Sequence, residues 1–121
     1  MHLEELQRLL AGGEDSQHQF KREITHPDSL AAELVAQSNS GGGQIFVGVE
    51  DDGRISGLSP QQVRVFNQLL SNTASNNVRP PIHPSTQNIA TEQGVVIVVT
   101  VAAGLNQPYM DAQGRVWVKN G

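Results

Sequence analysis

The chain has 121 residues, a length typical of one domain built around one hydrophobic core. It contains no cysteine, which excludes disulfides, thiol nucleophiles and cysteine-ligated zinc or iron–sulfur sites. The formal net charge of -4 opposes strong nonspecific attraction to phosphate backbones, and every apolar run is far shorter than the ~20 residues that span a bilayer.

The N-terminal part of the chain predicts a short helix and a strand. Leucines recur at helical spacing through residues 2–11, and two glycines follow as a helix stop, so we expect an amphipathic helix there. The acidic start lacks the basic and apolar stretches of a secretory signal, which favours a cytosolic protein without a membrane segment. Residues 17–24 alternate loosely and predict a strand, with Phe20, and His18 as a weaker candidate, on one face.

A second helix and a hairpin are expected next. Pro27 suits the first turn of a helix whose apolar stripe ends before three consecutive glycines, residues 41–43. Residues 44–50 then predict a strand. The run Asp51-Asp52-Gly53 predicts a turn toward a short strand around Ile55.

The rest of the chain predicts a third helix and more strands. Ser59-Pro60-Gln61-Gln62 has the form of a capping box with proline at the first helical position, so a helix begins there. Strands are expected over residues 82–89 and 94–102, and the second is so rich in β-branched residues that it should be central and covered on both faces. A last hairpin should join residues 109–110 to residues 116–118.

These elements predict one α+β domain, with a mixed β-sheet and two or three packed helices, over residues 1–121. The chain ends at Gly121 directly after a predicted strand, so we expect an N-terminal fragment of a longer protein.

The most informative segment is residues 38–53, S-N-S-G-G-G-Q-I-F-V-G-V-E-D-D-G. It resembles the "A-N-T-x-G-G, apolar strand, G-V-D-D-D-G" pattern of the Schlafen AlbA-like family, which older schemes called a divergent AAA-type ATPase domain. Residues 13–21, G-E-D-S-Q-H-Q-F-K, resemble the family's "G-E-S-x-x-x-E-F-K", and Gly57-Leu58, Pro108-Tyr109 and residues 116–119 match later elements. The resemblance implies a DNA-binding or other nucleic-acid-binding module of a transcriptional-regulator-like protein.

The glycine-rich turn has two interpretations, because glycine lets a backbone approach phosphate closely but also ends helices. Here the glycines leave a helix and enter a strand, whereas a phosphate cradle leaves a strand and enters a helix. No G-x-x-x-x-G-K-[ST] motif occurs in the sequence. The pattern therefore favours a structural turn and disfavours ATP hydrolysis.

Acidic residues provide a candidate divalent-metal site, since Mg²⁺ and Mn²⁺ prefer several oxygen ligands and can activate water. The candidate ligands are Glu14, Glu50 and Asp51, with Asp52 beside them. Schlafens that cut RNA use two glutamates and one aspartate, and the resemblance places these at Glu14, Gln19 and Asp51. Because Gln19 is an amide, a metal-dependent ribonuclease is an alternative function rather than the leading one. Alternatively, Asp51 and Asp52 are solvated turn residues without a metal.

Candidate nucleic-acid ligands come from the cations and from the motif itself: Lys21, Arg22, Asn39, Gly41, Gly42 and Lys119. Exposed strand-edge cations are also common without any ligand. Arg79, Arg115 and Lys119 lie in a C-terminal half that is poor in acids. Trp117 and Tyr109 could stack on bases, although packing roles are favoured for both.

The leucine stripe of the first helix, with Leu3, Leu6, Leu9 and Leu10, offers a surface for a homodimer. The resemblance supports this expectation, because two related halves pack together in the Schlafen core. In the alternative, the stripe folds back on the core of its own chain. A structural oligomerisation domain is accordingly a third candidate function.

Overall fold

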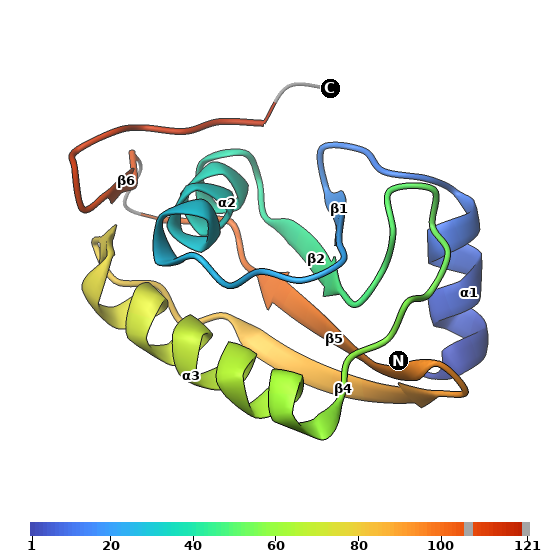
Figure 1. Cartoon of the computed structure of the whole chain (residues 1–121). Coiled ribbons are helices and arrows are strands. Elements are labelled where there is room, and N and C mark those ends of the chain that lie inside the picture. The colour runs from blue at the N-terminus through green and yellow to red at the C-terminus, as the bar shows by residue number, and fades with distance from the viewer. Residues whose placement is uncertain (106–107, 120–121) are drawn as a thin grey trace.

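The computed structural model describes residues 1–105 and 108–119, and residues 106, 107, 120 and 121 lie outside the described part. Within the described residues, three helices and a mixed sheet of four strands form an α+β fold, joined by a second sheet of two short strands (Figure 1). The elements in chain order are α1 (Leu3–Ala11), β1 (His18–Lys21), α2 (Pro27–Asn39), β2 (Gly43–Val47), α3 (Pro60–Asn76), β3 (Val78–Arg79), β4 (Ser85–Thr91), β5 (Gly94–Val101) and β6 (Met110–Asp111). The predicted fold class is confirmed.

The main sheet has the strand order β1-β2-β5-β4. β1 runs parallel to β2, and the other neighbours are antiparallel. The continuous apolar strand β5 lies inside the sheet, and its alternate residues enter two different cores: Ile97 and Val99 on one face, Val96 and Val98 on the other. The prediction of a central strand covered on both faces is therefore confirmed.

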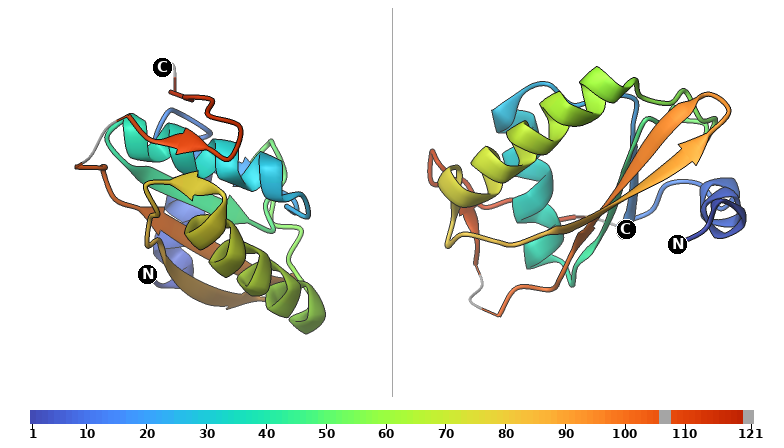
Figure 2. Two further views of the ribbon diagram at one scale, coloured as in Figure 1. Left: turned by 90° about the vertical axis from the view of Figure 1, so that its left-hand side faces the viewer. Right: turned by 90° about the horizontal axis from the view of Figure 1, so that it is seen from below.

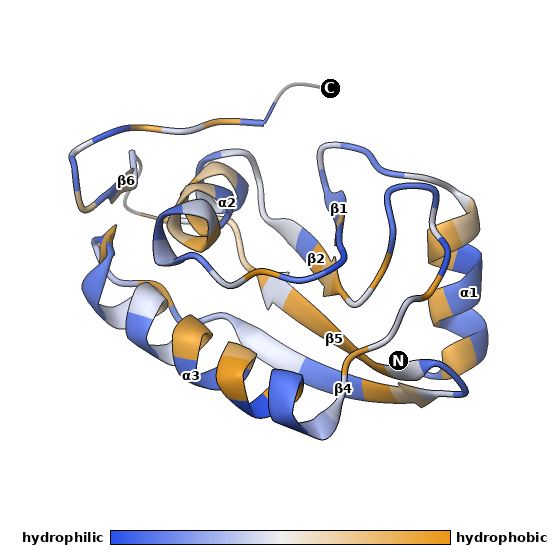
Figure 3. Cartoon of the chain, viewed as in Figure 1, coloured by the Kyte–Doolittle hydropathy of each residue, from blue (hydrophilic) through white to orange (hydrophobic). Residues whose placement is uncertain are grey.

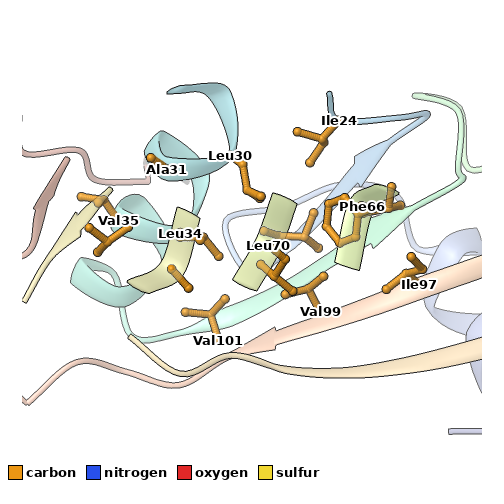
Figure 4. Packing of buried hydrophobic residues seen from close by; sticks show 14 of the residues in the cluster. Ile24, Leu30, Ala31, Leu34, Val35, Phe66, Leu70, Ile97, Val99 and Val101 are labelled. Atoms are coloured by element: carbon orange, nitrogen blue, oxygen red, sulfur yellow. The ribbon is translucent and has the colours of Figure 1, made fainter. Parts of the chain in front are cut away.

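Helices α2 and α3 cover one face of the main sheet, and α1 lies alone on the other face (Figure 2). The larger core lies between the two helices and the sheet, where Leu34 of α2 and Phe66 and Leu70 of α3 pack with Val99 and its neighbours (Figure 4). α3 begins as predicted, because the side-chain oxygen of Ser59 accepts a hydrogen bond from the Gln62 amide in a complete capping box. In the described residues no helix has the length and apolar character that crossing a membrane requires.

The leucine stripe of α1 folds back on its own sheet. Leu6 and Leu10 are buried in a second core with Phe20 and Phe46, whose rings meet edge to face at 5.9 Å. The apolar side of α1 accordingly faces the sheet in the hydropathy colouring (Figure 3). The alternative in which the helix covers its own core is the observed one, so this stripe no longer supports a homodimer.

The predicted last hairpin is wrong in its pairing. β6 pairs with β3, which the sequence analysis did not predict, and residues 116–118 form no strand. The physical reason is that side chains take the backbone groups that a ladder would need. The Asn39 side chain accepts a hydrogen bond from the Tyr109 amide and donates to the carbonyl oxygens of Tyr109 and Trp117. The C-terminal segment therefore runs along α2 as a single extended chain (Figure 1).

Candidate functional site

The glycine-rich turn closes α2. The Gly42 amide donates to the Gln37 carbonyl oxygen at 2.8 Å, and Gly41 has a φ of 89°, the bond and conformation of a glycine C-cap. A Cβ atom at Gly42 would lie 2.7 Å from the Val101 carbonyl oxygen. Of the two interpretations of this turn, the described contacts are those of a helix end packed against β5.

Asn39 fastens the C-terminal segment to α2. Its Nδ2 donates to the carbonyl oxygens of Tyr109 at 3.0 Å and Trp117 at 2.9 Å, while its Oδ1 accepts from the Tyr109 amide at 2.7 Å. Next to it, the Ser40 side-chain oxygen accepts from the Lys119 amide at 2.8 Å. Both polar atoms of the Asn39 side chain are thus used within the domain, and its predicted role as a nucleic-acid ligand stays a prediction.

Glu33 of α2 joins two of the predicted cationic ligands. Its carboxylate lies 2.7 Å from the Lys119 ammonium and 3.4 Å from that of Lys21, and the Glu33 and Lys119 side chains are mostly buried. Glu33 was not among the predicted site residues, because nothing in its local pattern distinguishes it from an ordinary helix-surface glutamate. The structure therefore brings Lys21 and Lys119 together, but around a carboxylate.

Arg22 lies apart from the glycine turn. β1 and β2 are parallel, so Lys21 pairs with Val47 at the end of β2, whereas Gly41 and Gly42 precede its start. Five residues of extended strand separate the two places by roughly 15 Å. The Arg22 guanidinium instead lies 3.9 Å from the Glu50 carboxylate.

The candidate catalytic and metal-binding residues do not assemble. Glu14 is exposed in the loop after α1, the Gln19 amide donates to the Asp15 carbonyl oxygen, and Asp51 is exposed in the turn after β2. The Glu50 carboxylate faces two guanidinium groups, those of Arg22 and Arg54, each at 3.9 Å. In residues 1–105 and 108–119 no three His, Asp or Glu side chains lie so as to hold a metal ion. Glu50, Asp51 and Asp52 line one cavity with Arg22, and the predicted metal site stays a prediction.

Asp111 organises the C-terminal turn and was not among the predicted site residues. Its buried carboxylate accepts from the Gln113 and Arg115 amides, from the Arg115 Nε at 2.8 Å and from the Trp117 Nε1 at 2.9 Å. Burial raises the pKa of this carboxyl, but the hydrogen bonds from Trp117, Arg115 and Gln113 outweigh burial and lower the pKa to about 2. A fixed negative charge thus orients both side chains.

Arg115 and Trp117 form an exposed cation–π pair. The Arg115 guanidinium carbon lies 5.4 Å from the centre of the Trp117 ring, a cation–π contact. The Arg115 side chain is 52% exposed and Trp117 is 39% exposed, whereas the other candidate aromatic, Tyr109, is buried. Arg79 is exposed on the neighbouring strand β3, which pairs with β6.

Charge is divided unevenly between the two parts of the chain. Residues 1–52 carry three basic and ten acidic side chains, and residues 53–121 carry five basic and two acidic ones, so their formal charges are -7 and +3. α1 and the acidic turn after β2 line a common cavity at one end of the molecule, and β3 and β6 lie at the other, from which the C-terminal segment runs back over α2 (Figure 1). Arg79, Arg115 and Trp117, here called the β3–β6 patch, belong to the part of the chain with positive formal charge.

Comparison with solved structures places the fold among known domains. The N-terminal domain of a RecG-related protein from Nitrosomonas europaea is similar with a TM-score of 0.72 and 22% identity, over 100% of this chain and 90% of that chain. The DIP2311 protein from Corynebacterium diphtheriae is similar with a TM-score of 0.68 and 21% identity, over 98% of this chain but 28% of that chain. The chain thus spans little more than a quarter of DIP2311. None of the curated proteins matches this chain.

A family model described as Schlafen, AlbA_2 matches residues 14–121. The match covers most of the chain, including the glycine turn, the Asn39 anchor and the C-terminal segment that it holds. The chain therefore belongs to the Schlafen AlbA_2 family.

Proposed function

We propose that this domain is a nucleic-acid-binding module whose contact surface is the β3–β6 patch. The observation that carries the proposal is the exposed aromatic ring of Trp117 in cation–π contact with the exposed Arg115, next to a strand, β3, that carries the exposed Arg79. Membership of the family is consistent with it, and so is the similar domain from a protein described as related to the DNA helicase RecG.

A net charge of -4 does not oppose such binding if the charge is segregated. Electrostatic interactions at physiological ionic strength fade over roughly 8 Å, so a phosphate responds mainly to charges near its contact point. Arg79 has no ion-pair partner among the described residues, and the partner of Arg115 is buried beneath it. The acidic end would instead turn away from the polyanion and orient the domain on it.

The predicted ligands from the sequence motif take supporting places in this proposal. Asn39 lies beneath the contact surface and holds the segment that carries Trp117, while Gly41 and Gly42 form the turn after Asn39 that packs against the end of β5. Lys21 and Lys119 are partly neutralised by Glu33 and contribute less than Arg79 and Arg115. Arg22 lies beside Glu50 and has no contact with the nucleic acid in this proposal.

The test is a salt series of binding measurements on two charge reversals. Arg79→Glu should weaken binding to labelled oligonucleotides of any sequence and lower the slope of log affinity against log salt by about 1 or more, because a phosphate contact is lost. Arg8→Glu on α1 is the matched control, since it makes the same charge change at the acidic end. Equal losses for both variants would show that only net charge matters and would refute the patch.

A structural oligomerisation domain is a second candidate function, favoured by Val116 and Val118, which are 52% and 59% exposed on one segment. A homodimer formed there would give about twice the 13.0 kDa chain mass in light scattering. Val118→Asp should return it to the mass of one chain. A monomer for the unmodified protein at all concentrations would reject this candidate. A role in a transcriptional regulator and a cytosolic location stay predictions.

A further inference from the structure

The Trp117 indole is held in one orientation. Its Nε1 donates to the Asp111 carboxylate at 2.9 Å, and the same carboxylate oxygen accepts from the Arg115 Nε at 2.8 Å. The Trp117 carbonyl oxygen is fixed by Asn39. A large flat side chain that is partly in water and tethered at both its ring nitrogen and its backbone is already arranged for contact, so little side-chain entropy is lost on binding.

The chemistry of this pair suits the face of a base. Proteins that bind single strands stack bases on aromatic rings and on the guanidinium planes of arginine, next to cations that contact the backbone. The Trp117 ring, which is 39% exposed, offers the aromatic surface, and the exposed Arg115 guanidinium beside it offers the cation. A duplex keeps its base faces stacked on one another and would meet the patch through phosphates alone.

We propose that an unpaired base stacks on the Arg115–Trp117 pair, and that the domain prefers single-stranded nucleic acid to duplex. This inference rests on the proposed function and adds the class of ligand. Asp111 is a positioning residue in it, because it acts on the ligand only through the two side chains that it orients.

The protein carries its own reporter, because Trp117 is its one tryptophan. Titration with oligodeoxythymidine or oligouridine should quench the intrinsic fluorescence strongly as a base stacks on the indole, and a duplex of equal length should change it little. Fluorescence that stays unchanged while a labelled single strand is shown by anisotropy to be bound would overturn the stacking.

Two substitutions test the aromatic face directly. Trp117→Leu should weaken single-strand binding roughly tenfold and leave duplex binding unchanged, as expected for the loss of one base–aromatic stack. Trp117→Phe keeps a flat ring and should restore most of the affinity. Val116→Ala, on the same segment, is the control for a general loss of exposed apolar surface and should have no effect.

Each outcome separates this inference from the proposed function. If Trp117→Leu binds single strands as tightly as the unmodified protein, or if duplex and single strand bind equally well, the inference is wrong while salt-dependent binding still supports the module. If neither form of nucleic acid binds, the proposed function itself falls. If Trp117→Leu does not fold, the fluorescence titration of the unmodified protein and the Trp117→Phe variant still decide the question.

Discussion

The Asn39 side chain donates a hydrogen bond to the Trp117 carbonyl oxygen at 2.9 Å and so joins residues 78 positions apart. The segment that carries Trp117 belongs to no sheet and is held in place mainly by side chains of α2 and by the Asp111 carboxylate. The family's glycine-rich motif therefore governs the proposed contact surface from beneath. Its effect on binding should be indirect and should pass through the order of this segment.

Replacing Asn39 with alanine should loosen the C-terminal segment and leave the main sheet intact. Three hydrogen bonds to backbone groups would be lost, so the free energy of unfolding measured in urea should fall by about 1–3 kcal/mol. Amide hydrogen exchange should speed up at Tyr109 and Lys119, with little change in β5. Asn67→Ala, on the exposed side of α3, is the control and should alter stability by less than about 0.5 kcal/mol.

Two neighbouring glycines should respond differently to alanine. Gly41 and Gly42 both have positive φ, at 89° and 85°, so each substitution costs about 1–2 kcal/mol of backbone strain. A Cβ at Gly41 meets open space, whereas one at Gly42 lies 2.7 Å from the Val101 carbonyl oxygen. Gly42→Ala should therefore be clearly the more destabilising of the two in thermal unfolding. Equal losses would mean that the turn can move away from β5.

The carboxylate of Asp111 should make stability depend on pH in the acid range. Burial opposes its ionisation, but hydrogen bonds from Trp117 and Arg115 lower its pKa from 3.8 to about 2. A depressed folded-state pKa gives stability that is complete above the ordinary pKa and is lost as pH falls through about 2. Asp111→Asn should therefore be less stable by about 2 kcal/mol near neutral pH, and the difference should close between pH 3.8 and about 2.

Urea titrations followed by Trp117 fluorescence at several pH values measure this difference. Gln113→Ala is a useful control, because it keeps the backbone amide that donates a hydrogen bond to the Asp111 carboxylate. Its free energy of unfolding should depend on pH as that of the unmodified protein does. A difference between Asp111→Asn and the unmodified protein that stayed constant down to pH 2 would contradict the assignment.

Local signals explain what could be predicted of the fold. Ser59 starts a helix through its hydrogen bond from the Gln62 amide, and Pro60 supports this start through its fixed φ. The apolar run of β5 packs into a core on each face of the sheet. The leucine stripe of α1 indicated that this side of the helix is covered. It did not indicate whether a partner chain or the helix's own sheet covers it, because the same amphipathic pattern suits both. β3 and β6 are two residues each, too short for an alternating pattern to show.

The candidate site was predictable in its residues but less so in their roles. The family resemblance indicated Asn39 and the glycines, but the inward hydrogen bonds of Asn39 to Tyr109 and Trp117 depend on the three-dimensional fold. The ion pairs of Glu33 join β1, α2 and the C-terminal segment, and no spacing rule links such distant positions. Asp111 lies in a turn sequence, where an aspartate is usually assigned to the turn itself.

Glu33→Gln should strengthen nucleic-acid binding while it weakens the fold slightly. The Glu33 carboxylate lies 2.7 Å from the Lys119 ammonium and 3.4 Å from that of Lys21, so it competes with any phosphate for both cations. Its replacement by an amide removes one negative charge beside Lys119, two residues from Trp117. Affinity at low salt should rise roughly threefold, and the salt slope should steepen by up to about 1. The free energy of unfolding should fall by about 1 kcal/mol, since the ion pairs are partly exposed.

Glu92→Gln, in the exposed turn between β4 and β5, makes the same charge change elsewhere and should leave affinity nearly unchanged. Equal affinities for the two variants in anisotropy titrations would show that Lys21 and Lys119 do not face the nucleic acid, and would restrict the contact surface to Arg79, Arg115 and Trp117.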